Sequence, residues 1–399
     1  MRRRHTVICR EGWYFLLVFL FVAFSSVLRN VNLLMIVATI MLFAFIIAWR
    51  TAIRSLNGVS LHRQIPPSLT AGDLLEVKLE LQSKPLRNPF ARAGSRCLEI
   101  DETIRHLAPK RKLPKKMVRL VCWYLPRGRA KQLSYQARLF ERGIYRIGPT
   151  QMATGFPLGL IRHSRILDHS DRITVFPRTG RLTPAFGKIF QQIQVGFSGH
   201  PLRHDRQTGD FHGLRDWKEG DGRRLIHWKS TARRGTPLVR EFENPQHQQL
   251  NLLVDLGNRS DYPGETRCEE VIRFAATIVT DFCRRRDGVL RMAIAGRVLS
   301  CGGGPCHPLL ISDLLTLLAT AEPRSGNDGS NALFREGLKH LFSPTERSGP
   351  TLILHPGSEN GRELASLADR SMGEYQTTGP LRWIDTSGEM LWHYFDPTE

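Results

Sequence analysis

Two apolar stretches near the start of the 399-residue chain constrain its fold more than any other feature. Between Trp13 and Trp49 the only full charge is Arg29, which Asn30 follows. A helix needs about 20 apolar residues to cross the hydrocarbon layer, so this length predicts two spans joined by a tight turn. Residues 1–55 are therefore predicted to form a two-helix membrane anchor, with the lipid bilayer as a partner.

Basic residues flank these two spans unequally. Arginines at positions 2, 3, 4 and 10 precede the first span and Arg50 and Arg54 follow the second, whereas the turn carries one arginine. The positive-inside bias then places both termini and the main domains in the cytoplasm. A cleaved signal peptide is the alternative, but no small-x-small cleavage site precedes the second apolar run, which would itself stop transfer.

The region that follows has the pattern of a β domain. In "LLEVKLELQ" the apolar residues Val77, Leu79 and Leu81 alternate with charged ones, as in a half-buried strand. Similar short runs, "MVRLVCWYL", "LSYQARLF", "GIYRIGP" and "RITVFP", are rich in β-branched and aromatic residues and end at turns. We expect an antiparallel β-sandwich over residues 56–180.

The C-terminal region alternates strand and helix patterns. The strands are "LNLLVDL", "VLRMAIAG" and "TLILHPG", and the helices are "ETRCEEVIRFAATIVTDFCRRR", "LLISDLLTLLATA" and "ENGRELASLADR". Such alternation predicts a parallel sheet covered by helices, an α/β domain over residues 249–399. Ligands of these sheets bind beyond the carboxyl ends of strands, so Asp255 is where a ligand-binding acid is expected; capping the next loop is its alternative role.

Composition restricts the class of partner. Lys plus Arg outnumber Asp plus Glu by 57 to 37, which gives a net charge of +20 and favours anionic surfaces. The basic residues are scattered, so they identify no specific nucleic-acid module, and the neighbouring membrane accounts for the charge. The seven cysteines lie far apart, which predicts no disulfide framework and fits a reducing compartment.

Between the two domains, residues 181–248 form a linker that contains the unusual segment "EGDGRRLIHWKSTARR". Gly220 and Gly222 permit a turn into a short helix that the Asp221 carboxylate caps. The helix is predicted to have one apolar and one basic face. The apolar face comprises Leu225, Trp228 and Ala232, and the basic face comprises Arg223, His227 and Arg234.

Three roles are open for this segment. In a catalytic site His227 would be the general base and Asp221 would orient its imidazole, but the segment lacks an evident nucleophile. Contact with an anion is a second role. The third, which we favour, is a clasp with Trp228 buried between domains, or a docking surface. Its residues are Asp210, Arg215, Asp221, Arg224, His227, Trp228, Lys229, Arg233, Arg240 and Glu241. No catalytic residue is assigned.

The longer segment "GDFHGLRDWKEGDGRRLIHWKSTARRGTPLVREFE" resembles the signature of the domain of unknown function 58 family. Asp210 and Asp216 stand where that family has Glu, and Trp217 where it has Tyr. The resemblance implies a bacterial inner-membrane protein with a von Willebrand factor type A-like C-terminal domain. It also implies association with a MoxR-type AAA+ ATPase and with transglutaminase-like proteins, and it implies no established catalytic activity.

A type A domain holds its metal with Asp-x-Ser-x-Ser after the first strand, because hydroxyl and carboxylate oxygens suit a hard cation. This chain has Asp255 but an arginine at position 259, so no metal or cofactor is expected, with a divalent cation at Asp255 as the alternative. The "CGGGPCH" segment has the wrong spacing for zinc and is interpreted as a turn. The "GFSGH" segment lacks the spacing of a serine nucleophile elbow.

The sequence thus predicts a membrane-anchored, cytosol-facing adaptor or scaffold that docks a protein partner, a MoxR-type AAA+ ATPase, in envelope assembly or chaperone work. Two alternatives remain. One is a divalent-metal phosphoesterase or nuclease that uses Asp210, Asp216, Asp221 and His227. The other is a nucleic-acid-binding protein, whose affinity would fall steeply with salt.

Overall fold

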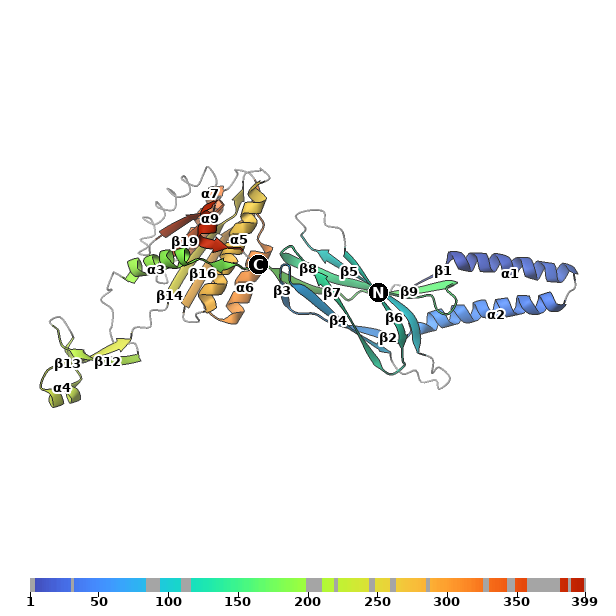
Figure 1. Ribbon diagram of the computed structural model, residues 1–399, viewed down its shortest axis with the longest axis horizontal. Coiled ribbons are helices and arrows are strands. Elements are labelled where there is room, and N and C mark those ends of the chain that lie inside the picture. Colours follow the sequence, from blue (N-terminus) through green and yellow to red (C-terminus); the bar gives the residue numbers. More distant parts are fainter. Residues whose placement is uncertain are drawn as a thin grey trace. The chain divides into compact units, whose positions relative to one another are not determined.

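The computed structural model describes residues 4–29, 32–83, 94–108, 116–198, 210–218, 222–243, 248–258, 263–284, 288–325, 330–342, 349–356, 381–386 and 389–397. The chain forms two compact units, Met1–Arg178 and Thr179–Glu399 (Figure 1). The predicted turn at Asn30 and the predicted helix over 359–370 lie outside the described residues.

Two long apolar helices begin the first unit. Helix α1 spans Arg10–Arg29 and helix α2 spans Asn32–Ser55, with mean hydropathies of 1.8 and 2.4 over their most apolar windows. At 1.5 Å per residue they are about 30 and about 36 Å long, enough to cross a hydrocarbon layer. Phe15 and Phe45 stack between them with ring centroids 6.4 Å apart. The two predicted apolar helices are confirmed.

A strand precedes the first helix. Strand β1, Arg4–Ile8, pairs antiparallel with β9, Ile161–Leu167, so the start of the chain belongs to the β-sheet that follows the helices. The sequence prediction assigned all of residues 1–55 to the anchor and missed this strand. At the other end, α2 is followed directly by strand β2, Val59–Gln64. Both ends of the helical hairpin are therefore fixed to one β body.

Close packing fixes the helices to that body. The Cys9 N–H donates to the Leu160 carbonyl oxygen over 2.9 Å. A Cβ on Gly12 would lie 2.3 Å from the same oxygen, so only glycine fits this approach of α1 to the β8–β9 loop. From α2, Ala48 and Ala52 are buried in the same small apolar cluster as Leu160. The hairpin thus meets the β body through small residues.

Two sheets make up the β body. The remaining strands are β3 Ser68–Thr70, β4 Leu74–Ser83, β5 Ser95–His106, β6 Lys116–Leu125, β7 Ala130–Arg138, β8 Gly143–Thr154 and β10 Asp171–Phe176. One sheet has the order β2-β4-β7; the other has the order β1-β9-β8-β10-β3, with β5 paired to β8 and β6 paired to β5. All described pairs are antiparallel except β10 with β3.

The sheets pack face to face on one core. Leu79 of β4 belongs to the same buried cluster as Ile100 of β5 and Ile147 of β8, and all three are fully buried. The predicted inward residues Val77 and Leu81 also have no exposed surface. The alternation in the sequence therefore identified the buried face of β4, because successive strand residues point to opposite faces.

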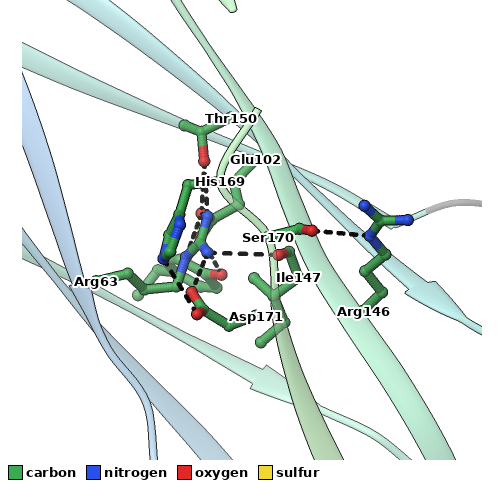
Figure 2. A network of polar contacts seen from close by, with 9 residues as sticks. Arg63, Glu102, Arg146, Ile147, Thr150, His169, Ser170 and Asp171 are labelled. Atoms are coloured by element: carbon green, nitrogen blue, oxygen red, sulfur yellow. Dashed lines mark hydrogen bonds and ion pairs between the residues drawn. The ribbon is translucent and has the colours of Figure 1, made fainter. Parts of the chain in front are cut away.

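A buried polar network crosses this core (Figure 2). Arg63 of β2 reaches Glu102 of β5 with 2.8 Å between Nε and Oε1, Thr150 of β8 over 2.7 Å, and Asp171 of β10 over 2.5 Å. Tyr135 of β7 donates to the other Glu102 oxygen. Burial, and then the Glu102 charge, raise the pKa of Tyr135 well above its ordinary value. Five strands from both sheets are thereby joined.

We predict that Glu102→Gln destabilises the first unit by about 3 kcal/mol, because it leaves the Arg63 charge buried with only Asp171 as a carboxylate partner. The matched control is Glu99→Gln in the exposed pair with Arg162, where the cost is expected to be about 1 kcal/mol or less. Urea unfolding of the detergent-solubilised chain, followed by circular dichroism, measures both. Equal costs would contradict a structural role for the network.

The second unit is built on a five-stranded sheet. Its strands are β14 Gln248–Asp255, β16 Gly288–Ala295, β17 Leu299–Pro305, β19 Thr351–His355 and β20 Leu381–Asp385, in the order β17-β16-β14-β19-β20. The strands run parallel except β17, which pairs antiparallel with β16. The predicted parallel strands are present. The "CGGGPCH" segment, predicted to be a turn, instead contributes most of edge strand β17.

Helices cover both faces of this sheet (Figure 1). They are α5 Pro263–Arg284, α6 Pro308–Thr320 and α7 Ser330–Leu341, with α3 Pro184–Ser198 and α9 Glu389–Tyr394 nearby. Leu253 of β14 packs with Phe334 and Leu338 of α7. Its neighbours in β14 face the other way, where α5 contacts β14, β16 and β19.

The beginning and end of the second unit meet on α5. A short strand β11, Arg181–Leu182, pairs with β21, Phe395–Asp396. Phe186 of α3 and Phe395 both pack against Phe274 of α5, with ring centroids 5.6 and 5.5 Å apart. This aromatic cluster closes the unit on itself.

Candidate functional site

The signature segment folds as a β-hairpin that carries a short helix. Strands β12, Asp210–Asp216, and β13, Leu238–Glu243, are antiparallel. Between them lie one 3-10 turn, η1 Arg223–Leu225, and helix α4, Trp228–Arg234 (Figure 1). The Trp217 N–H donates to the Pro237 carbonyl over 2.9 Å, and the His227 N–H donates to the Leu238 carbonyl over 2.8 Å. The inserted residues therefore fold back on their own hairpin.

The predicted single helix from Asp221 is wrong. Gly222 begins η1 without a side-chain cap, and Ile226 is extended with φ −66° and ψ 127°. Ile226 forms a β-bridge with Val239, and this pairing separates η1 from α4. Leu225 and Trp228 thus lie on different elements, so they do not share the predicted apolar face. Leu225 is buried, whereas the Trp228 side chain is 67% exposed.

His227 caps helix α4. Its Nδ1 accepts from the Ser230 backbone N–H over 3.3 Å and lies 2.8 Å from the Ser230 hydroxyl. At the other end Gly235 has φ 77°, the left-handed conformation of a helix C-cap, and its N–H donates to Thr231 over 2.8 Å. The Nδ1 lone pair that a general base would use is therefore engaged in holding the helix start.

Most of the other predicted residues are either exposed or outside the described residues. The side chains of Asp210, Asp221, Arg224 and Glu241 lie outside the described residues. Arg215 is half-buried and donates to the Asp216 carbonyl over 3.1 Å. Those of Trp228, Lys229, Arg233, Arg234 and Arg240 are exposed. Burial of Trp228 in a clasp therefore requires a surface from outside β12, β13 and α4.

We predict that His227→Ala weakens α4 by about 1 kcal/mol, because the Ser230 N–H loses its acceptor. His227→Asn keeps an acceptor of similar reach and is expected to restore most of the loss. Hydrogen exchange of the 228–234 amides measures the difference. Equal protection in His227→Ala and the parent would show that the imidazole does not hold this helix.

A second cluster lies at the carboxyl edge of the parallel sheet. Asp255 ends β14 and His355 ends β19, the strand beside it. The chain leaves β14 through α5 to β16 on one side, whereas β19 lies on the other side. The two residues therefore span the point where strand order reverses, which is where α/β sheets bind ligands. Asp255 was predicted at this position; His355 was not.

The Asp255 carboxylate is occupied by protein donors. Its Oδ2 lies 2.9 Å from His355 Nδ1, and its Oδ1 lies 3.2 Å from the Gly257 N–H and 3.6 Å from Arg324 Nη2. Because an ionised carboxylate only accepts, His355 Nδ1 carries the proton of this bond. Arg324 arrives from β18, Arg324–Ser325, which runs parallel to β15, Gly257–Asn258. Asp255, His355 and Arg324 are all buried.

These contacts do not fit a divalent cation. Each oxygen of Asp255 faces at least one hydrogen-bond donor, and a guanidinium lies where a hard cation would need a further oxygen. Among the described residues, no group of three or more His, Cys, Asp or Glu side chains is arranged to hold a metal. Arg259 and Asp261 lie outside the described residues. The residues present thus support a structural use of Asp255.

We predict that millimolar Mg²⁺ or Mn²⁺ leaves the melting temperature of the chain unchanged, because the Asp255 oxygens are already engaged. Asp255→Ala is expected to cost about 3 kcal/mol, since it leaves Arg324 buried without this carboxylate. Thermal denaturation with and without each ion measures both effects. A metal-dependent rise in the parent that disappears in Asp255→Ala would overturn the assignment.

Comparison with known proteins finds a family match that covers most of the signature segment and includes Asp255 and Arg324 but ends one residue before His355. Residues 213–354 match the model of a family described as "Protein of unknown function DUF58". "Uncharacterized protein YeaD" of Bacillus subtilis (strain 168) is 26% identical over 151 residues, which cover 38% of this chain and 36% of that protein. The match thus spans little more than a third of the relative's length.

Solved structures resemble the chain only distantly. A β-glucosidase from Listeria innocua in complex with isofagomine has a TM-score of 0.21 at 13% identity, covering 29% of this chain and 16% of that one. A CARDB domain from Pyrococcus furiosus has a TM-score of 0.20 at 11% identity, covering 30% and 94%. At these TM-scores neither likeness bears on fold or function.

Proposed function

Because residues 213–354 place this chain in the DUF58 family, we propose that the protein is a membrane-anchored adaptor or scaffold that docks a protein partner. The observation that carries the proposal is the exposed helix α4. It presents Trp228 beside basic side chains, and the predicted base of the segment, His227, caps this helix. Such a surface is suited to contact and not to bond-making chemistry.

The proposed docking surface, called the α4 surface, comprises Leu214, Trp217, Trp228, Lys229 and Arg233. The exposed fractions of its three apolar side chains are 37%, 39% and 67% in that order. Tryptophan and arginine are the residues that most often dominate binding energy at protein interfaces. The basic residues select a partner with an acidic surface and accelerate its encounter more than they strengthen the complex.

The membrane anchor sets where this docking takes place. Both ends of the α1–α2 hairpin return to the same β-sandwich, so the sandwich lies on one side of any bilayer that the hairpin spans. The arginines that flank the spans favour the cytoplasmic side of a bacterial inner membrane. The protein then faces the cytosol and works in envelope assembly or chaperone processes.

The partner we propose is a MoxR-type AAA+ ATPase, with a transglutaminase-like protein as a further member of the assembly. This follows from resemblance to the family. The helix-covered, mainly parallel sheet of the second unit is compatible with a von Willebrand factor type A-like domain. Metal-dependent hydrolysis is disfavoured, because among the described residues Asp216 is exposed and no metal-binding group is present.

Affinity purification from detergent-solubilised membranes, with and without ATP, tests the proposal. We expect an AAA+ ATPase to co-elute with the parent chain. Trp228→Ala should reduce its recovery about 30-fold, as for a hot-spot residue worth about 2 kcal/mol. The matched control is Trp392→Ala in α9, an exposed tryptophan outside the α4 surface. Equal recovery with both variants, or co-elution of nucleic acid alone, would contradict the proposal.

A further inference from the structure

The end of the β-sandwich that is joined to α1 and α2 has a surface of aromatic and basic side chains. Strand register brings the same ends of several strands together there: Ser95 pairs with Leu125, and Thr154 pairs with His163. The Gly128 N–H donates to the Ser83 carbonyl, which adds the β6–β7 turn. We call this end the rim. Its described surface includes Arg96, Trp123, Tyr124, Arg129, Lys131, Phe156 and Leu158.

The rim adjoins both ends of the helical hairpin (Figure 1). The β8–β9 loop that carries Leu158 also carries Leu160, whose carbonyl accepts from Cys9 just before α1. On the other side, the Ser95 hydroxyl donates to the carbonyl of Ser55, the last residue of α2, over 2.5 Å. Any bilayer that α1 and α2 cross therefore begins next to the rim.

Helix length places the rim at headgroup depth. Trp49 precedes the end of α2 by six residues, or about 9 Å of helix. Trp13 lies three residues, or about 5 Å, from the start of α1. The polar layer of one leaflet is about 5–8 Å thick, so with Trp13 and Trp49 at the edge of the hydrocarbon the rim lies within the headgroups beside α1 and at their outer edge beside α2. The sandwich is then close enough to the lipid for its side chains to bind.

The exposed apolar residues of the rim are of the kinds that favour a membrane interface. Trp123 is 74% exposed, Tyr124 is 44% exposed and Leu158 is 53% exposed. Tryptophan and tyrosine collect at headgroup level because their rings are apolar and their N–H or O–H groups stay hydrated. The Arg96 guanidinium lies over the Tyr124 and Phe156 rings, 5.9 and 5.4 Å from their centroids.

The charge of the rim is complementary to anionic lipid. Arg54, Arg96 and Arg129 are exposed there, and Lys131 is half-buried. Among the described residues at or near the rim and in the adjoining helices the acids are Glu11, Glu80 and Glu99, and Glu99 is paired with Arg162 over 2.5 Å. Basic residues near an anionic leaflet each contribute about 1 kcal/mol to membrane binding.

We propose that the rim is a second membrane-binding surface, which docks the sandwich on the anionic headgroups of the leaflet at which α1 and α2 leave it. The inference rests on the anchoring part of the proposed function. Docking holds the sandwich in one orientation against the bilayer, where the hairpin alone would leave it free to tilt. The ligand is the phosphate of an acidic phospholipid, together with the interfacial layer that receives Trp123 and Leu158.

Tryptophan quenching in the full chain tests the contact. The protein is placed in nanodiscs of phosphatidylcholine with 30% phosphatidylglycerol and with nitroxide on the lipid headgroups. Subtracting the emission of Trp123→Phe from that of the parent isolates Trp123, which we expect the nitroxide to quench at least twofold. Trp13→Phe isolates Trp13 in the same way. If the nitroxide quenches Trp13 but not Trp123, the proposal that the rim binds the membrane is wrong and the membrane anchor is supported. If it quenches neither tryptophan, both proposals are wrong.

A charge comparison tests the lipid preference. Arg129→Gln with Lys131→Gln is expected to reduce the quenching of Trp123 by about half. The matched control is Lys116→Gln with Arg138→Gln at the opposite end of the sandwich. Lys131 and Lys116 each donate to one backbone carbonyl, over 3.3 and 3.0 Å, so both pairs lose comparable protein contacts. The proposal that the rim binds anionic lipid would be wrong if both double variants reduced the quenching of Trp123 equally. It would also be wrong if Trp123 were quenched equally in nanodiscs without phosphatidylglycerol.

Discussion

The pairing of β1 with β9 is the interaction on which the arrangement of the first unit depends. Five residues at the start of the chain align with β9 from Arg4 opposite Arg165 to Ile8 opposite Ile161. Because α1 begins two residues later and α2 leads directly into β2, the pair of apolar helices starts and finishes at one β body. A single helix cannot cross a bilayer and return, so the two apolar helices are compatible with one membrane anchor.

Local periodicity explains what the sequence predicted correctly. A strand buried on one face alternates every second residue, as Val77, Leu79 and Leu81 do, and a helix such as α5 repeats its apolar residues every three to four. These patterns can be recognised without knowing which other strand or helix each element packs against. Strand β1 was missed because its five residues are too few to show a pattern and their partner lies more than 150 residues away. Edge strand β17 was missed because its glycines resemble a turn.

Tertiary contacts supply what the sequence could not show about the candidate site residues. His227 and Asp255 belong to residue types that often carry catalysis or bind metal, yet His227 caps α4 and Asp255 is held by His355, Gly257 and Arg324. Of the Asp255 partners only Gly257 is close in sequence, two residues away, so spacing alone did not identify the others. The same holds for Arg63 and Glu102, which meet only when the two sheets pack. These polar residues thus hold the fold, whereas the side chains of Trp228 and Trp123 are exposed.

The account requires that the whole β and α/β body lie on one face of the membrane, the cytoplasmic face. Trypsin digestion of matched spheroplasts and inverted inner-membrane vesicles, followed with an epitope at the C-terminus, measures this directly. The account predicts that the epitope-bearing body is degraded in inverted vesicles and protected in spheroplasts. Degradation in intact spheroplasts would place the body on the opposite side and contradict both the cytosolic partner and the orientation inferred from the flanking arginines.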